Sequence, residues 1–266
     1  MMQEADDFRA ESRALHALLE PIDPERFTAP TQFKGWSIND VLQHLHVWNK
    51  MAALQLSDEA EIERQFASLI ELEGKLRVFE AELLDGLSGA GLLAAWIAGA
   101  ESLADAFAGA DPKQRLKWVG PSMSARSSIT ARLMETWAHG QEVYDELGVV
   151  RANADRIRGI VVLGVNTYRW TYMAHGAEPP GPMPQLVLTA PSGAVWTHGE
   201  AGESGLIEGL AEDFCQVVTQ TRNVKDTGLN VSGEIATDWM SKAQCFAGPP
   251  ATPPKPGERF TRTSQH

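Results

Sequence analysis

The strongest constraint on the fold is a helical pattern in which an acid and a histidine share an apolar row. Side chains four residues apart lie one turn apart on the same helix face. At this spacing the chain has Ala131, Glu135, His139, Val143 and Leu147. The other three members are apolar, so the row is predicted to face inward. A buried carboxylate and imidazole are costly without partners, and a divalent metal would satisfy both.

A third candidate ligand comes from a second predicted helix. Residues 37–40 (Ser-Ile-Asn-Asp) fit a capping box, so a helix is predicted to begin there, and His44 lies on its apolar stripe. With Glu135 and His139, His44 would complete a His₂Glu set, the pattern of catalytic zinc sites that keep one open position. Asp40 also precedes His44 by four residues, but its capping role already accounts for it.

The competing interpretation of these residues is a metal-free core. An acid four residues before a histidine is not rare in a chain with seven histidines. It also fits a helix pair with a hydrogen-bonded core histidine. Among the other histidines, His16 and His46 are predicted at the surface or an interface, and His198 is a more distant candidate. Cys215 and Cys245 lie in apolar helical patterns and are predicted to be buried, inert thiols.

Two further residues are candidate pocket residues. Trp118 precedes a Gly-Pro loop and could line a pocket, although a core position is the simpler interpretation. Arg222 follows a predicted helix and could bind the carboxylate of a substrate. The alternative that we favour for Arg222 is a cation at a helix C-terminus.

Periodicity and composition divide the chain into three regions. Residues 1–150 are predicted to form an antiparallel four-helix bundle. Residues 151–247 mix helical and β-rich runs and are predicted to form a smaller α+β domain. Residues 248–266 begin with a proline-rich stretch and are predicted to form an extended tail.

Five segments have more specific predictions. Residues 58–84 are charged and helical, with a break midway. Short β-rich runs around a Pro-Ser-Gly turn predict a hairpin over 185–197. A helix is predicted over 207–221, a strand over 229–232 and a last helix over 236–246.

Composition excludes several classes of partner. The 266 residues are 43% apolar and 22% charged, which is typical of a soluble globular protein. The net charge of −12 argues against nucleic acid or an anionic membrane as partner. No apolar run approaches the roughly 20 residues that span a bilayer. The acidic start does not fit a secretory signal, and two cysteines are too few for a disulfide framework, so a cytoplasmic location is expected.

Two motifs carry a resemblance to a known superfamily. Residues 35–45 (GWSINDVLQHL) resemble the Trp-x-x-x-Asp-x-x-x-His-Leu signature of DinB-like metal-binding bundles. Residues 135–139 (ETWAH) are similar to the Glu-x-x-x-His motif of the mycothiol-dependent maleylpyruvate isomerase branch. The resemblance implies His44, Glu135 and His139 as metal ligands and a C-terminal α/β domain with a sterol-carrier-like fold.

The chain most resembles an actinobacterial-type group of metal-binding proteins within this superfamily. The shared stretches are residues 118–125, 132–141 and 211–219. Some members carry a name referring to wyosine base formation, for which the residues here offer no chemical support. The chain departs from the pattern at Asn49, where the group often has Asp, and in the charged segment 58–84.

The resemblance implies a metal-dependent enzyme acting on a small organic substrate. A divalent metal, Zn²⁺ above all, would activate a low-molecular-weight thiol such as mycothiol or glutathione, giving an isomerase or transferase. Activation of water, giving a hydrolase, is the alternative at the same site. A non-catalytic metal- or ligand-binding protein and a metal-free scaffold also stay open.

Overall fold

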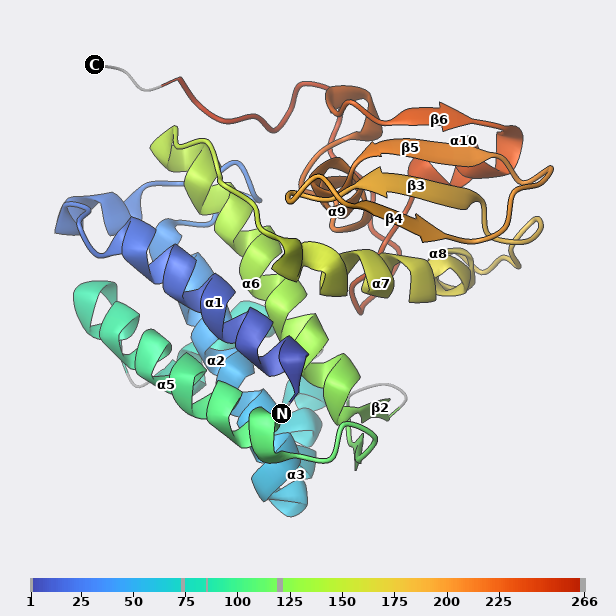
Figure 1. Ribbon diagram of the computed structural model, residues 1–266. Coiled ribbons are helices and arrows are strands. Elements are labelled where there is room, and N and C mark those ends of the chain that lie inside the picture. The colour runs from blue at the N-terminus through green and yellow to red at the C-terminus, as the bar shows by residue number, and fades with distance from the viewer. Residues whose placement is uncertain (1, 73–74, 85, 119–121, 264–266) are drawn as a thin grey trace. The chain divides into compact units, whose positions relative to one another are not determined.

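The computed structural model describes residues 2–72, 75–84, 86–118 and 122–263 (Figure 1). By the density of its internal contacts the chain divides into two compact units, Met1–Val143 and Tyr144–His266. This division falls within a long helix, whereas the sequence placed the boundary at residue 150.

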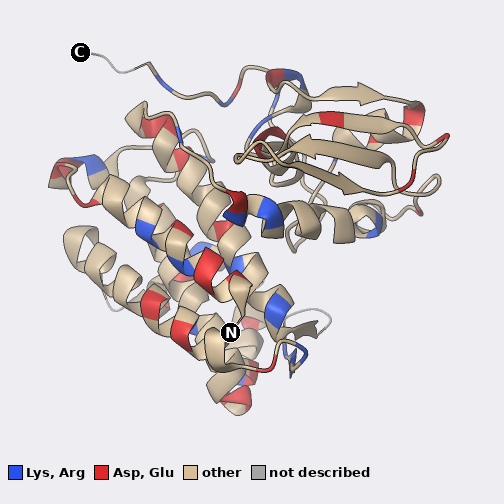
Figure 2. Ribbon diagram, viewed as in Figure 1, with Lys and Arg blue, Asp and Glu red and all other residues tan. Residues whose placement is uncertain are grey.

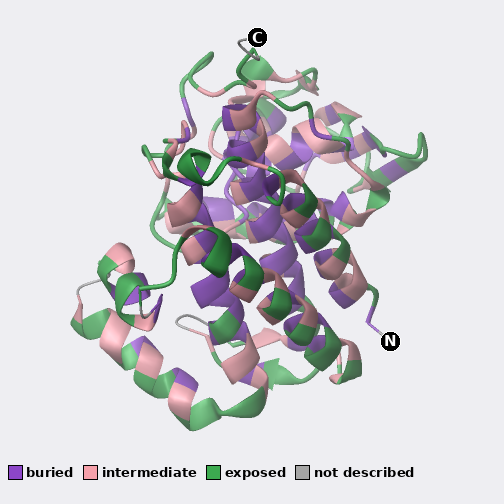
Figure 3. Ribbon diagram, turned by 90° about the vertical axis from the view of Figure 1, so that its left-hand side faces the viewer, coloured by how far each residue is buried: buried purple, intermediate pink, exposed green. Residues whose placement is uncertain are grey.

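The described part of the first unit is helical apart from one short strand pair. Its long helices are α1 (Gln3–Leu19), α2 (Ile38–Ser57), α5 (Gly89–Gly109) and α6 (Ala125–Leu147), the last of which continues into the second unit. The smaller elements are η1 (Pro24–Thr28), α3 (Glu59–Glu71), α4 (Leu76–Leu84), β1 (Arg115–Leu116) and β2 (Met123–Ser124). Helix α5 packs on α1 and α2, while α3 and α4 pack on α2. Buried residues follow the inward sides of these helices (Figure 3).

Local signals place the ends of the two helices that carry the candidate ligands. Helix α2 begins with the predicted capping box: the amide of Asp40 donates to Ser37 Oγ at 3.1 Å, and the amide of Ser37 donates to Asp40 Oδ2 at 2.9 Å. Helix α6 ends at Leu147, and Gly148 follows with φ of +69°. This left-handed conformation is favourable for glycine and closes the helix. Both predicted helix ends are confirmed.

A seam of polar contacts joins α2 to α6. Along this seam His44 faces Glu135, Asn49 accepts a hydrogen bond from Arg132, and Gln55 accepts one from Ser128. Residue numbers rise along α2 as they fall along α6, so the two helices are antiparallel. The seam places the predicted acid–imidazole row of α6 against the predicted histidine of α2.

Helix α5 is the most apolar of the long helices. Among the described residues it alone is long and apolar enough to cross a membrane by length and composition. Its buried residues include Leu92, Trp96, Leu103 and Phe107, which belong to the core of the first unit. Ion pairs from Arg9 and Arg13 on α1 to Glu101 on α5 join the two helices. Figure 2 shows basic and acidic residues by colour along the ribbon. Burial of one face against α1 and α2 accounts for the apolar composition of α5.

The second unit combines helices with a four-stranded sheet. The sheet order is β4 (Val195–His198), β3 (Gln185–Thr189), β5 (Leu206–Leu210), β6 (Asn230–Ser232). Strand β3 is antiparallel to β4, as the predicted hairpin requires, and parallel to β5. The helical elements are η2 (Asp155–Ile157), α7 (Arg158–Asn166), α8 (Tyr168–Ala174), α9 (Ala211–Val218), η3 (Val224–Asp226) and α10 (Glu234–Met240).

Two predicted helices of this unit are partly wrong. The segment 207–221 was predicted to be entirely helical, but its first residues form β5 and only Ala211–Val218 are α-helical. Leu206, Ile207 and Leu210 fit a helical spacing locally, and pairing with β3 overrides that pattern. The last predicted helix, 236–246, ends at Met240.

The C-terminal segment 248–263 belongs to the second unit, forms no helix or strand, and is hydrogen-bonded to the rest of that unit. Thr261 Oγ1 donates to Asp145 Oδ1 at 2.9 Å, and Asn223 Nδ2 donates to the carbonyl of Pro254 at 2.8 Å. Arg259 Nη1 donates to the carbonyl of Gln220 at 2.9 Å. The predicted extended segment is therefore held in place by polar contacts along its length.

Candidate metal centre

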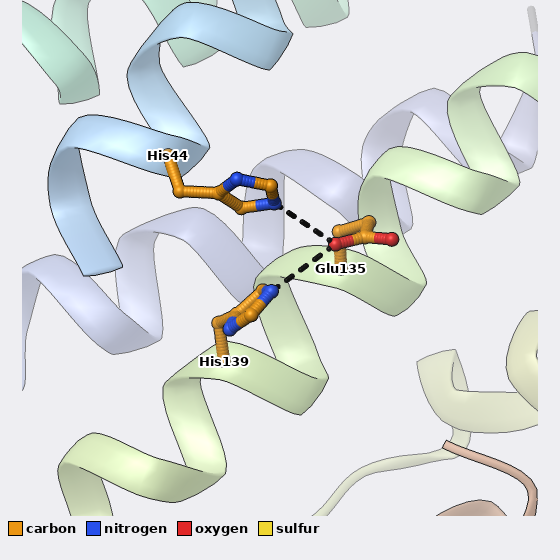
Figure 4. A group of neighbouring side chains, drawn as sticks. All are labelled: His44, Glu135 and His139. Carbon is orange, nitrogen blue, oxygen red and sulfur yellow. Dashed lines mark hydrogen bonds and ion pairs between the residues drawn. The ribbon is translucent and has the colours of Figure 1, made fainter. Parts of the chain in front are cut away.

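The structure brings the three predicted ligands together in the first unit. His44 on α2 and His139 on α6 point at the carboxylate of Glu135, which lies one helical turn before His139 (Figure 4). His44 Nε2 and His139 Nε2 each lie 3.3 Å from the same oxygen, Glu135 Oε2. One ligand atom from each residue lies within 4.8 Å of the other two. The side chains of His44, Glu135 and His139 are 10%, 24% and 12% exposed.

The two 3.3 Å separations are long for charge-assisted hydrogen bonds and match the spacing of neighbouring ligand atoms around a zinc ion. A charge-assisted N–H···O bond is about 2.7–2.9 Å long. Zinc bonds to nitrogen and oxygen of about 2.0–2.1 Å in a tetrahedron place neighbouring ligand atoms roughly 3.3 Å apart. The distances from His44 Nε2 and from His139 Nε2 to Glu135 Oε2 are both 3.3 Å, the length expected between two zinc ligands. The donor set and the two separations from Glu135 are therefore compatible with a shared divalent ion.

A fully buried carboxylate on α4, that of Glu80, contacts the Nδ1 side of the His44 imidazole. Glu80 Oε1 lies 2.6 Å from His44 Nδ1 and accepts a hydrogen bond from Trp48 Nε1 at 3.0 Å. Its other oxygen accepts one from Arg77 Nη1 at 2.6 Å, and Arg77 also pairs with Asp40. A carboxylate on Nδ1 fixes the tautomer that leaves Nε2 free to ligate. Figure 4 shows Nε2 facing Glu135.

Aromatic side chains enclose the other imidazole. The Trp36 ring is stacked on His139 with centroids 5.7 Å apart and 5° between their planes, and Phe33 meets His139 edge-on at 5.1 Å. The guanidinium of Arg77 lies 4.8 Å from the Trp36 ring centroid. Arg77 thus contacts both Trp36, which stacks on His139, and Glu80, which contacts His44.

The electrostatic environment favours the ligating form of two of the three residues. Burial would raise the pKa of Glu135, but hydrogen bonds from His139 and His44 outweigh burial and hold that pKa well below its ordinary value. Burial lowers the pKa of His139 and outweighs its contact with Glu135. Burial also lowers the pKa of His44, but contacts with Glu135 and Glu80 reverse the shift and raise it. An ionised Glu135 and a neutral His139 are the forms that bind a metal.

The other sequence-predicted residues lie elsewhere or serve other contacts. Trp118 packs against Trp48, with ring centroids 5.4 Å apart, whereas residues 119–121 of its predicted loop lie outside the described residues. Arg222 lies in the second unit, where Nη1 and Nη2 donate to Asp145 at 2.7 and 2.6 Å, so this pairing engages its guanidinium. His198 is on β4 of the same unit. His46 was predicted at the surface or an interface, which is wrong for this chain, since only 7% of it is exposed.

Glu80 is the main site residue that the sequence analysis missed. The signal was available, because Leu76, Glu80 and Leu84 form a row at four-residue spacing, like the row that revealed Glu135. From the sequence, segment 58–84 is identified only as a charged departure from the family pattern. In the structure, helix α4 of this segment supplies Glu80, whose carboxylate contacts Nδ1 of His44.

Comparison with solved structures shows the fold class of this chain. The fold is similar to the crystal structures of the mycothiol-dependent maleylpyruvate isomerase (TM-score 0.55, 15% identity) and of a histidine-to-alanine mutant of that enzyme (TM-score 0.53, 16% identity). Each match covers 87% of this chain and 93% of the other. The chain thus has the helix-rich fold with a small sheet that is seen in those structures.

Sequence comparison gives the family. The model of the mycothiol maleylpyruvate isomerase N-terminal domain matches residues 8–144, and the chain belongs to this family. It is also 37% identical over 244 residues to two uncharacterized proteins of Mycobacterium tuberculosis, from strains CDC 1551 / Oshkosh and ATCC 25618 / H37Rv. These matches cover 92% of this chain and 95% of each relative.

Proposed function

We propose that this protein is a metal-dependent enzyme that uses a low-molecular-weight thiol to isomerise, or to transfer a group to, a small organic substrate. The observation that carries the proposal is the convergence of His44, Glu135 and His139, whose ligand atoms all lie within 4.8 Å of one another. Membership of a family named for a mycothiol-dependent isomerase supports the thiol and the reaction class.

The donor set favours Zn²⁺ held by the two Nε2 atoms and one oxygen of Glu135. Two imidazoles and one carboxylate are a common set for catalytic zinc, in which a fourth position stays available to an external ligand. A divalent ion there would lower the pKa of a thiol or of water and so generate a nucleophile near neutral pH. Mycothiol or glutathione is the thiol that the resemblance favours.

The protein residues around this point have separate tasks in the proposed mechanism. Glu80 accepts a hydrogen bond from Nδ1 of His44 and keeps Nε2 directed at the site. Trp36 and Phe33 restrict the rotation of His139. Glu135 keeps its charge in a largely buried position because both histidines contact it. These contacts hold the ligands in place before an ion arrives, which favours binding.

The proposal includes the finer architecture and location. We assign the helical part, residues 1–150, to the DinB-like antiparallel four-helix bundles. We assign residues 151–247 to the sterol-carrier-like α/β domains, with 248–266 as their C-terminal extension. The antiparallel pairing of α2 with α6 supports the first assignment, and the mixed sheet with helices α9 and α10 is compatible with the second. A cytoplasmic location is part of the same proposal.

A thermal-shift experiment with paired samples tests the function. Metal-loaded and metal-free protein would be heated with mycothiol, glutathione, bacillithiol or coenzyme A, and the Glu135→Gln variant would serve as the site control. We expect one thiol to raise the Tm of the metal-loaded wild type alone. Equal shifts with and without metal, or with and without Glu135, would contradict a metal-assisted thiol site. Turnover of a small ester or amide without any thiol would favour the hydrolase alternative.

A further inference from the structure

The guanidinium of Arg77 connects three separate parts of the first unit. It lies on α4, three residues before Glu80, and its Nη1 donates to Glu80 Oε2 at 2.6 Å. Its Nη2 pairs with Asp40 in the first turn of α2 and donates to Gln43 Oε1 at 2.8 Å. The guanidinium also lies 4.8 Å from the centroid of the Trp36 ring. One side chain thus joins α4, α2 and the loop that precedes α2.

The first connection runs from Arg77 through Glu80 to His44. The Glu80 carboxylate is fully buried, and its two oxygens have different partners. Oε1 lies 2.6 Å from His44 Nδ1, whereas Oε2 accepts the hydrogen bond from Arg77. A carboxylate is planar and rigid, so a charged bond that fixes one oxygen also fixes the position of the other. The orientation of the His44 ring therefore depends on Arg77 through Glu80.

The second connection runs from Arg77 through Trp36, which ends a tight turn. The amide of Trp36 donates to the carbonyl of Phe33 at 2.9 Å. The two residues between them, Lys34 and Gly35, have φ of +54° and +70°, which is compatible with a type I′ turn. This turn holds the Phe33 and Trp36 rings 5.1 Å apart, and both rings contact the imidazole on α6.

The conformation of this turn requires support from outside it. A lysine rarely adopts positive φ, because its Cβ then crowds the backbone, so Lys34 does not favour the turn by itself. A β-bridge between Pro30 and Ser37 closes the base of the loop. The cation–π contact of Arg77 attaches Trp36 to α4. Arg77 is thus one of the contacts that keep the aromatic pair on the imidazole.

We propose that Arg77 is a positioning residue that sets the orientation of His44 and His139 together. It acts on the first ring through the carboxylate of Glu80 and on the second through the ring of Trp36. The two imidazoles belong to different helices, so their Nε2 atoms face one ion only when both rings are correctly oriented. The inference rests on the proposed function, because it treats the triad as a metal centre, and it adds the residue that couples the two imidazoles.

The competing explanation is that Arg77 only attaches α4 to α2. Its ion pair with Asp40 and its hydrogen bond to Gln43 would do so without any effect on the imidazoles. Lys50→Gln is the matched control, because Lys50 Nζ on α2 donates to the carbonyl of Leu83 on α4 at 3.4 Å. A purely structural role predicts that both variants lower the Tm and that neither alters the triad.

Two substitutions of Arg77 separate its charge from its shape. Arg77→Gln removes the positive charge and the fork of donors. Arg77→Lys keeps the charge and one ion pair, so it should retain the fold even where Arg77→Gln unfolds. A single ammonium group, however, does not reproduce the planar guanidinium that meets Glu80, Asp40 and the Trp36 ring at once. Both variants should therefore disturb the triad, and Arg77→Gln should disturb it more.

Competition with a chromophoric chelator measures the Zn²⁺ affinity, and the visible spectrum of the Co²⁺ form reports the ligand geometry. We expect Arg77→Gln to bind Zn²⁺ about 10–100-fold more weakly than the wild type, the range typical of losing an outer partner of a metal ligand. Arg77→Lys should lie between the two, with a shifted Co²⁺ spectrum, and Lys50→Gln should match the wild type. Wild-type affinity and spectrum in Arg77→Lys would overturn the proposal.

The imidazole ¹H and ¹⁵N NMR signals of the metal-free protein test the coupling itself. Arg77→Lys should shift the ring signals of both His44 and His139, whereas Lys50→Gln should shift neither. A shift confined to one of the two rings would overturn the claim that Arg77 orients them together.

These signals also separate the positioning role from the proposed function, because they need no metal. If the wild type binds no divalent ion while Arg77→Lys shifts both rings, the positioning role stands and the metal-dependent function is overturned. If the wild type binds one Zn²⁺ and neither its affinity nor the ring signals respond to Arg77, the positioning role is overturned and the metal-dependent function stands.

Discussion

Replacing Glu80 by glutamine should weaken metal binding although Glu80 is not itself a ligand. Glutamine keeps the size of the side chain, and its carbonyl oxygen can still accept from His44 Nδ1 and Trp48 Nε1. Its amide group, however, would face Arg77 Nη1, so two donors would meet where a 2.6 Å ion pair now lies. The imidazole of His44 would also lose the negative charge that increases its basicity as a ligand.

The expected loss of metal affinity follows from the role of such outer partners. Their removal typically costs 10–100-fold in affinity, or about 1.4–2.7 kcal/mol. Loss of the charged hydrogen bond to Arg77 should also reduce the free energy of unfolding by roughly 1.5–3 kcal/mol. Glu82→Gln is the matched control, because Glu82 lies on the same helix and is exposed.

Competition titration against a chromophoric chelator measures the affinity for Zn²⁺, and the visible spectrum of the Co²⁺ form reports the ligand geometry. Glu80→Gln should bind Zn²⁺ more weakly with a shifted Co²⁺ spectrum, whereas Glu82→Gln should match the wild type. If Glu80→Gln binds Zn²⁺ with unchanged affinity and an unchanged Co²⁺ spectrum, Glu80 does not position His44.

Three further predictions concern acid stability, the second unit and the cysteines. Burial would raise the pKa of Asp40, but hydrogen bonds from Ser37 at the helix cap and the charge of Arg77 lower this pKa below its ordinary value. The ionised Asp40 therefore stabilises the fold above its unfolded pKa of about 3.9. This stabilisation is lost as the pH falls through the lower pKa of the folded state. Urea unfolding of wild type and Asp40→Asn should therefore differ at pH 7 by about 1 kcal/mol or more, and the difference should begin to shrink only below about pH 4. A difference that stays constant as the pH falls further would contradict this. Asp145→Asn should cost about 3–5 kcal/mol in urea unfolding, because it leaves a buried guanidinium unpaired, and a loss below about 1 kcal/mol would refute that role. Cys215 and Cys245 are buried and burial raises the pKa of Cys215, so a thiol reagent should label the unfolded chain and leave the native chain unlabelled; rapid native labelling would be the contrary result.

The positions of His44, Glu135 and His139 on inward helix faces were predictable because their signals are local. The capping box placed the start of α2, and the acid–imidazole row of α6 stood out against apolar neighbours. The register between α2 and α6 is a tertiary property that no single segment specifies. The inward stripe of the second helix suggested His44 as the partner of Glu135 and His139, and the resemblance to DinB-like proteins implies the same three residues.

The residues around the triad were harder to predict because each depends on a partner far away in the sequence. Glu80 lies 36 residues from His44, and its row on α4 is meaningful only once α4 packs on α2. The segment Leu206–Leu210 has apolar residues at helical spacing, which predicted a helix. It is instead a strand, because it pairs with β3, a distant segment that the local pattern does not reveal. The burial of His46 likewise depends on packing beyond its own helix.

The most direct test of the central claim is the zinc stoichiometry and affinity of the untagged chain, measured by elemental analysis and chelator competition. The wild type and a His16→Ala control should bind one Zn²⁺ per chain. His139→Ala should bind it more weakly by more than the roughly 10–100-fold typical of losing an outer hydrogen-bond partner. A wild type that takes up no stoichiometric Zn²⁺ or other divalent ion, or a His139→Ala variant that binds Zn²⁺ as tightly as the wild type, would contradict the account.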